Sequence, residues 1–312
     1  MQRKDFTIQS TFDNLNLKVV VMVPDTPVLG VVQFVHGMTE HKERYFDFMD
    51  FFLKEGYAVS IYDHRGHGES VLNKDDLGYF YDSNANAIVE DLFLVTNKIK
   101  DMFSDVPIIL FSHSMGSLVA RNFLKKYDNL IDKLIVCGSP SKNPFTGIAL
   151  FIVNIMSLIK GGKYRSNLIQ NLAFNSCNKK VGATKKNGWL CANSEMVDKY
   201  NEDALCSFIF TLNGFRNLFK LLKNTYNKNG WNVKNSELPI LFLAGEDDPI
   251  IEGEKGWVNA QNFLRDVGYN SVSGILYDGM RHEIFHEKRR DLVFSDIINW
   301  IQDKTVVICE SE

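Results

Sequence analysis

Residues 106–124 constrain the fold more than any other part of the chain. The segment opens with an apolar run rich in β-branched residues (106–111), passes through F-S-H-S-M-G-S (111–117) and ends in a helical pattern (118–124). Small residues flank Ser114, as a sharp turn requires when neighbouring backbone comes close to it. Ser112 stands where such turns usually carry glycine. The segment therefore predicts a buried strand that turns sharply at Ser114 into a helix.

This strand, turn and helix are typical of a nucleophile elbow, in which the serine Oγ stands clear of the backbone above a sheet. A serine that only caps a helix gives a similar local sequence. The interpretation therefore depends on partners for Ser114 elsewhere in the chain.

The rest of the chain alternates between strand and helix patterns. The first two strands read as an antiparallel hairpin with a turn at Asp13-Asn14. The alternation predicts an α/β fold with a mostly parallel central sheet and helices on both faces. Strands are expected at 6–10, 15–23, 30–35, 57–62, 106–111, 131–137, 238–244 and 273–277, and helices at 42–55, 84–103, 254–266 and 286–302.

The alternation stops after Ser139-Pro140 and resumes at Leu238. The residues between are mostly helical in pattern and contain no convincing strand. We therefore expect a core formed by residues 1–140 and 236–312, with residues 141–235 inserted as a mainly helical cap.

Composition excludes several classes of protein. The net charge of −3 over 312 residues lacks the basic excess that is typical of nucleic-acid-binding proteins. The five cysteines are widely spaced, which fits a reducing compartment, and the charged N-terminus lacks the apolar stretch of a signal peptide. The longest apolar stretch, 147–159, is too short to span a bilayer. We expect a cytoplasmic protein.

Candidate partners for Ser114 follow two late strands, where reactive groups gather in open α/β sheets. G-E-D-D-P-I (245–250) follows one strand and D-G-M-R-H-E (278–283) follows the last. A histidine activates a serine hydroxyl, and a carboxylate orients the histidine. The order Ser114, Asp248, His282 is that of an α/β-hydrolase triad. Pro249 would help to fix the loop at Asp248, although Asp247 stays an alternative.

An oxyanion hole needs two backbone N–H donors aimed at the developing charge. Met115, directly after the nucleophile, should supply one. The loop His36-Gly37-Met38 after the third strand should supply the other, with the Met38 amide as donor, because Gly37 lets that backbone come close.

The segment His282-Glu283-Ile284-Phe285-His286 also matches H-E-x-x-H, which on a helix can bind zinc. Here it follows a strand and Gly279, so His282 is expected in a loop, and no third ligand is apparent downstream. We expect no metal and no other cofactor.

Three motifs together carry a family resemblance: H-G-M-T-E-H (36–41), D-H-R-G-H-G-E-S (63–70) and S-H-S-M-G-S (112–117). They resemble the monoacylglycerol lipase and lysophospholipase group of α/β-hydrolases, also called the serine aminopeptidase family. The resemblance covers about residues 5–140 and 236–302. It implies an α/β-hydrolase fold, the same three catalytic residues, and oxyanion donors at Met38 and Met115. The cap carries no usable resemblance.

The cap has an unusual charge pattern. Residues 133–194 contain nine lysines and arginines and no Asp or Glu, and they include an apolar helix at about 147–159. Phe151 and Ile155 on that helix are candidates for contact with substrate. One interpretation is a buried helix whose lysines keep the cap soluble. The other is an apolar lid with a basic rim that rests on an anionic membrane surface.

We therefore expect a serine hydrolase that cleaves carboxylic esters of a single fatty acyl chain through an acyl-enzyme intermediate. Monoacylglycerol and lysophospholipid are the preferred substrates. The alternative is a general carboxylesterase or thioesterase for shorter acyl groups. An aminopeptidase is less favoured, because the cap has no acidic cluster to hold a substrate amine.

Overall fold

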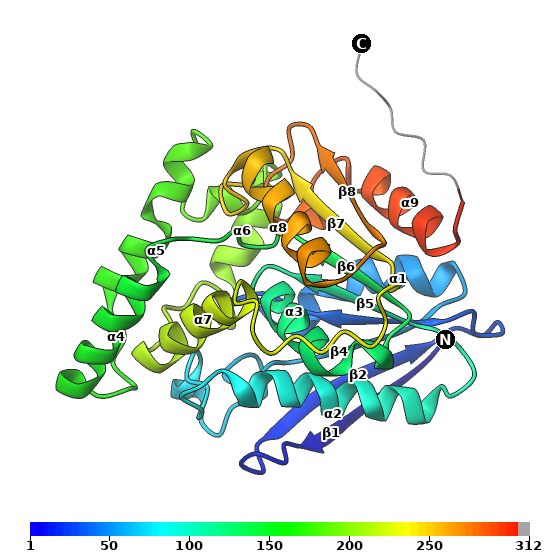
Figure 1. The fold of residues 1–312 in the computed structure, drawn as a ribbon, viewed down its shortest axis with the longest axis horizontal. Coiled ribbons are helices and arrows are strands. Elements are labelled where there is room, and N and C mark those ends of the chain that lie inside the picture. The colour runs from blue at the N-terminus through cyan, green and yellow to red at the C-terminus, as the bar shows by residue number, and fades with distance from the viewer. Residues whose placement is uncertain (305–312) are drawn as a thin grey trace.

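An eight-stranded sheet runs through the centre of the molecule, in the order β1-β2-β4-β3-β5-β6-β7-β8 (Figure 1). The computed structural model describes residues 1–304. β1 and β2 form the expected antiparallel hairpin, β2 is also antiparallel to β4, and the remaining pairs are parallel. The strands are β1 Gln2–Gln9, β2 Asn16–Val23, β3 Val31–Val35, β4 Ala58–Tyr62, β5 Ile108–His113, β6 Lys133–Cys137, β7 Ile240–Gly245 and β8 Val272–Tyr277.

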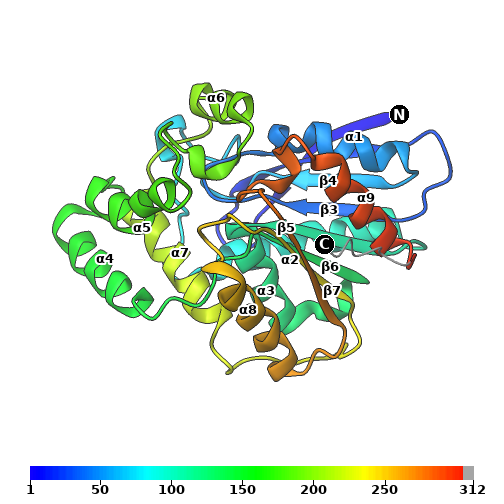
Figure 2. The same cartoon turned by 90° about the horizontal axis from the view of Figure 1, so that it is seen from above.

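Helices cover both faces of this sheet, as Figure 2 shows. α1 and α9 lie on one face, and α2, α3 and α8 lie on the other. The central strands β3, β4, β5 and β7 are buried along their whole length, which explains why their sequences are nearly continuous apolar runs. The helices are α1 Phe46–Lys54, α2 Asn86–Met102, α3 Met115–Tyr127, α4 Thr146–Lys160, α5 Asn167–Lys180, α6 Ser194–Glu202, α7 Leu212–Thr225, α8 Gly253–Val267 and α9 Arg290–Ile301.

Four of these helices, α4 to α7, lie between β6 and β7 in the chain. α4 packs against α7, and α7 packs against α3 of the central layers. α4 and α5 lie at one end of the molecule, beyond the ends of the strands (Figures 1 and 2). The helical character expected for this insertion is confirmed, while its exact boundaries at residues 140 and 236 stay a prediction.

The last helix begins later than the sequence pattern predicts. α9 starts at Arg290, and His286 lies in the short 3-10 helix Ile284–His286, where it is buried. Its ring lies 4.6 Å from that of Phe285. The short turn and α9 share one apolar pattern in the sequence, because both pack against the same core.

Two further observations concern the cysteines and the apolar character of the helices. The cysteines at 137, 177, 191 and 206 are buried and form no disulfide, and Cys309 lies outside the described residues. Among the helices of residues 1–304, none combines the length and the apolar character needed to cross a membrane.

Candidate active site

Ser114 occupies the sharp turn between β5 and α3. Its backbone has φ 52° and ψ −120°, a positive-φ conformation that residues with a side chain rarely adopt. Its N–H donates to the carbonyl of Cys137 on β6 over 3.0 Å. A Cβ on Gly116 would lie 2.2 Å from the carbonyl oxygen of Val35, so only glycine lets α3 come this close to β3. Ser112 fits because its hydroxyl donates to the Ile135 carbonyl at 2.8 Å.

The structure brings Ser114, His282 and Asp248 together from three separate strand ends. His282 Nε2 lies 2.8 Å from Ser114 Oγ, and His282 Nδ1 lies 2.8 Å from Asp248 Oδ2. Asp248 follows β7 and is buried, whereas its neighbour Asp247 is exposed and does not reach the imidazole. The other Asp248 oxygen accepts the N–H of Ile250 at 2.9 Å, which fixes the orientation of the carboxylate.

The environment of His282 suits a base. Burial lowers the pKa of its imidazole, but the charge of Asp248 and the hydrogen bond to it raise the pKa by more, so that the net pKa is above the ordinary histidine value. The imidazole can therefore accept a proton from Ser114 and be stabilised as an imidazolium by Asp248.

The loop after β3 lies beside Ser114. Met38 and Met115 line the same cavity as Ser114 and His282. Met115 is the first residue of α3, so its N–H has no acceptor within the helix. A Cβ on Gly37 would lie 3.1 Å from that of Ser114, which shows how closely this loop approaches the turn.

The next residue in this loop, Thr39, has a positive φ of 54°. Its hydroxyl donates to the Met38 carbonyl at 2.7 Å and lies 2.6 Å from the Tyr200 hydroxyl of α6. A β-branched residue at positive φ is strained, and these contacts hold it there. The sequence motif at 36–41 includes Thr39, but nothing in it predicts the anchor from α6.

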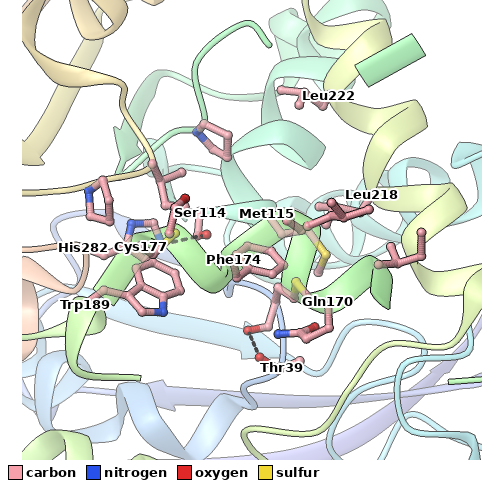
Figure 3. Close-up of a pocket in the computed structure, with 18 of the residues that line it drawn as sticks. Thr39, Ser114, Met115, Gln170, Phe174, Cys177, Trp189, Leu218, Leu222 and His282 are labelled. Carbon is pink, nitrogen blue, oxygen red and sulfur yellow. Dashed lines mark hydrogen bonds between the residues drawn. The ribbon is translucent and has the colours of Figure 1, made fainter. Parts of the chain in front are cut away.

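A cavity of about 730 Å³ opens onto Ser114 and His282. Figure 3 shows Leu218 and Leu222 of α7 on one side of it and Phe174 and Trp189 on the other. The Trp189 ring lies 5.0 Å from the ring of His282. Sequence reasoning missed Trp189, since nothing in the residues around it distinguishes it from an ordinary core tryptophan.

The apolar helix α4 faces the cavity with one side only. Ile148, Ala149 and Ile152 line the cavity, whereas Phe151 and Ile155, the candidates from the sequence, do not. Phe151 and Ile155 are 64% and 42% exposed.

The H-E-x-x-H segment does not form the helix that a zinc site would need, and both nitrogens of His282 are already engaged. Among residues 1–304, the ligand atoms of His41, Asp203 and Cys206 lie within 4.8 Å of one another. The His41 ring, however, bonds Asp203 at 2.7 Å through Nε2 and Glu43 at 2.5 Å through Nδ1. Burial lowers the pKa of His41, but these two carboxylates raise it by more, so an ion pair accounts for the cluster.

The sheet order and the three residues at the strand ends define an α/β-hydrolase. Residues 26–289 match the family described as "Serine aminopeptidase, S33". The chain belongs to this family of hydrolases, which confirms the resemblance noted in its motifs.

Several proteins resemble the chain over most of its length. It is 25% identical to a monoacylglycerol lipase of Mycolicibacterium smegmatis, over 90% of this chain and 91% of that protein. It is 23% identical to phospholipase YtpA of Bacillus subtilis, over 86% of this chain and 93% of that protein. The solved structure of a thermostable carboxyl esterase from Bacillus coagulans superimposes with a TM-score of 0.89 at 24% identity, covering 98% of this chain and all of that one.

Proposed function

We propose that the protein is a serine hydrolase that cleaves carboxylic esters of a single fatty acyl chain. The observation that carries this proposal is the largely apolar cavity that Ser114 lines, with His282 Nε2 2.8 Å from its Oγ. A volume of about 730 Å³ is typical of small-molecule sites and suits one acyl chain with a small alcohol. The relatives named monoacylglycerol lipase and phospholipase support a lipid ester as the substrate.

In this mechanism, His282 accepts the proton of Ser114 as its Oγ attacks the ester carbonyl. The N–H groups of Met38 and Met115 stabilise the oxyanion. The alcohol leaves with the proton from His282, and the acyl group stays on Ser114. Water, activated by His282, then attacks the acyl-enzyme and releases the fatty acid, while Asp248 keeps the imidazole oriented throughout.

A hydrolysis panel tests the reaction and its substrate together. Monoacylglycerols and lysophospholipids should be cleaved faster than short esters, acyl thioesters and aminoacyl anilides. Ser114→Ala should lower kcat by several orders of magnitude while the protein stays folded. Preference for short or thioester-linked acyl groups would favour the carboxylesterase or thioesterase alternative. Near-normal turnover by Ser114→Ala would refute the assignment of Ser114 as the nucleophile.

We further propose that the cap rests on an anionic lipid surface when the enzyme takes up substrate. Several apolar side chains of α4 and α5 do not line the cavity and are exposed. We call them the exposed apolar face: Phe151, Leu158, Ile159 and Leu168. Lysines at 142, 160, 163 and 179, on or beside α4 and α5, are also exposed. Apolar burial with electrostatic attraction is how monotopic helices bind anionic membranes. Adsorption to anionic vesicles should weaken with salt; equal adsorption to neutral vesicles at low salt would contradict the proposal.

A further inference from the structure

A buried guanidinium lies between two loops of the active site. Arg44, in the short 3-10 helix Lys42–Tyr45, has a side chain that is only 8% exposed. Its Nη1 donates to Glu40 Oε2 at 2.6 Å and to Glu283 Oε1 at 2.8 Å, and its Nη2 donates to Glu283 Oε2 at 2.8 Å. A planar guanidinium that binds a carboxylate through two parallel hydrogen bonds fixes both the distance and the orientation of its partner.

Glu40 belongs to the loop that carries Met38. Its other oxygen accepts the N–H of Gly37 and the hydroxyl of Tyr45, the latter at 2.9 Å. Glu40 therefore closes the loop from residue 37 to residue 40 and fixes the backbone on both sides of Met38.

Glu283 directly follows His282. Its carboxylate binds Arg44, and its own N–H donates to the Leu190 carbonyl at 2.7 Å. Arg44 thus connects the loop that holds Met38 to the loop that holds His282, although Arg44 and Glu283 are 239 residues apart in the chain.

Both carboxylates of this network depend on Arg44 for their ionised state. Burial raises the pKa of Glu40, but the hydrogen bond to His113 and the charge of Arg44 outweigh it and hold the pKa well below the usual range. Burial likewise raises the pKa of Glu283, and Arg44 lowers it by more. Moving either loop would leave a buried carboxylate without its partner, which is costly. The network therefore favours one separation of the two loops.

We propose that Arg44 is a positioning residue for the reaction: it sets the separation between the Met38 N–H and the imidazole of His282. The proposal rests on the proposed function, in which these two groups act on the same ester. Displacement of a reacting group by about 1 Å can cost on the order of a hundredfold in rate. Arg44 would therefore act on kcat without touching the substrate.

The chain offers a matched control. Arg65 is also buried, and it binds Asp91 at 2.7 Å and Asp13 at 2.9 Å. None of these three residues lines the active-site cavity. Loss of the Arg65 fork should therefore affect stability without affecting the geometry of the site.

The experiment compares Arg44→Lys with Arg65→Lys, because lysine keeps the positive charge but cannot donate the paired hydrogen bonds of a guanidinium. Kinetics on a soluble ester are normalised to the folded fraction from thermal unfolding. Arg44→Lys should lower kcat at least about tenfold with KM within about twofold, whereas Arg65→Lys should keep kcat near that of the wild type. A folded Arg44→Lys enzyme with wild-type kcat, or a loss explained by its unfolded fraction, would overturn the proposal.

Glu283→Gln provides a second test, including the case in which Arg44→Lys does not fold. The charged and titratable groups that face His282 are Asp248, Glu283, Glu40 and His113, and Arg44 binds the two glutamates. Glutamine cannot accept both guanidinium N–H groups, so kcat should fall. Removal of a negative charge should also move the acidic side of the kcat/KM profile to lower pH, whereas Arg44→Lys should leave it in place.

The kcat of the folded fraction separates a positioning role from a purely structural one, because a loss of stability alone does not change that kcat, and the pH profile separates loss of the Glu283 charge from loss of its hydrogen bonds to Arg44. An unchanged profile and unchanged kcat in Glu283→Gln would contradict the proposal. The activity of Ser114→Ala distinguishes failure of the proposed function from failure of the Arg44 proposal. If Ser114→Ala hydrolyses esters normally, the proposed function itself fails, whatever the result for Arg44→Lys.

Discussion

Ser114 Oγ and His282 Nε2 lie 2.8 Å apart although 168 residues separate them in the chain. The contact depends on the parallel order of β5, β6, β7 and β8, which brings the ends of β5 and β8 to the same edge of the sheet. The distance is that of a hydrogen bond ready for proton transfer.

The identity of the acidic residue can be tested by two neighbouring substitutions. Asp248→Asn should lower kcat by about 10⁴-fold, because the amide favours the wrong tautomer of His282. It should also shift the acidic side of the kcat/KM profile to lower pH, since Asp248 raises the pKa of His282. Asp247→Asn is the control, because Asp247 is exposed, and its kinetics should match the wild type. The reverse result would assign the role to Asp247.

The elbow should tolerate no side chain at residue 116. Gly116→Ala places a Cβ 2.2 Å from the Val35 carbonyl, so we expect a loss of about 1–3 kcal/mol in the free energy of unfolding, together with reduced turnover. Gly147→Ala, on an exposed part of α4 with open space around it, should instead gain about 0.5–1 kcal/mol. Urea unfolding of both variants measures the difference, and equal stabilities would argue against the close approach of α3 and β3.

Buried neutral histidines should make the fold sensitive to acid. Burial lowers the pKa of His67 and that of His286 to about 3. An unfolded histidine titrates near 6.5, so the unfolded state binds more protons between these values. The stabilising contribution is complete above pH 6.5 and is lost as the pH falls toward 3, at up to about 1.4 kcal/mol per pH unit for each histidine.

The measurement is the urea midpoint at pH 7.5, 6 and 5. His286→Phe should flatten the dependence, because both ring nitrogens of His286 lack a hydrogen-bond partner and phenylalanine does not titrate. Midpoints that do not change over this range would contradict the expectation, and so would an unaltered slope in His286→Phe.

The exposed apolar face should govern adsorption to lipid. A double change, Leu158→Ser with Ile159→Ser, removes side chains that are 87% and 73% exposed. Partition into anionic vesicles should fall at least about tenfold, whereas the rate of hydrolysis of a soluble ester should stay near that of the wild type. Leu292→Ser on α9 is the control, because Leu292 is 42% exposed but lies on another part of the molecule. Co-sedimentation measures all three proteins, and equal partition would count against a membrane-facing cap.

Much of this architecture could be predicted from the sequence because it depends on local patterns. Strands buried on both faces give continuous apolar runs, and the turn at Ser114 needs small neighbours such as Gly116. The parallel sheet then implies which strand ends meet. This reasoning located the elbow and the segments that carry Asp248 and His282.

The remaining features depend on contacts between distant segments. α4 is apolar nearly all round, so its sequence cannot indicate that Ile152 faces the cavity while Phe151 faces outward. The fork of Arg44 joins residues from both ends of the chain, and an isolated arginine beside Tyr45 gives no sign of Glu283 as its partner. Burial of His286 likewise follows from tertiary packing and not from local pattern.

The position of His282 beyond β8 has a consequence for how the molecule is made. A growing polypeptide acquires the strained serine well before its base, which follows 168 residues later and lies beyond β8. Until β8 docks at the sheet edge, the hydroxyl is an ordinary alcohol. A chain in which β8 has not yet docked therefore carries the nucleophile without the group that activates it.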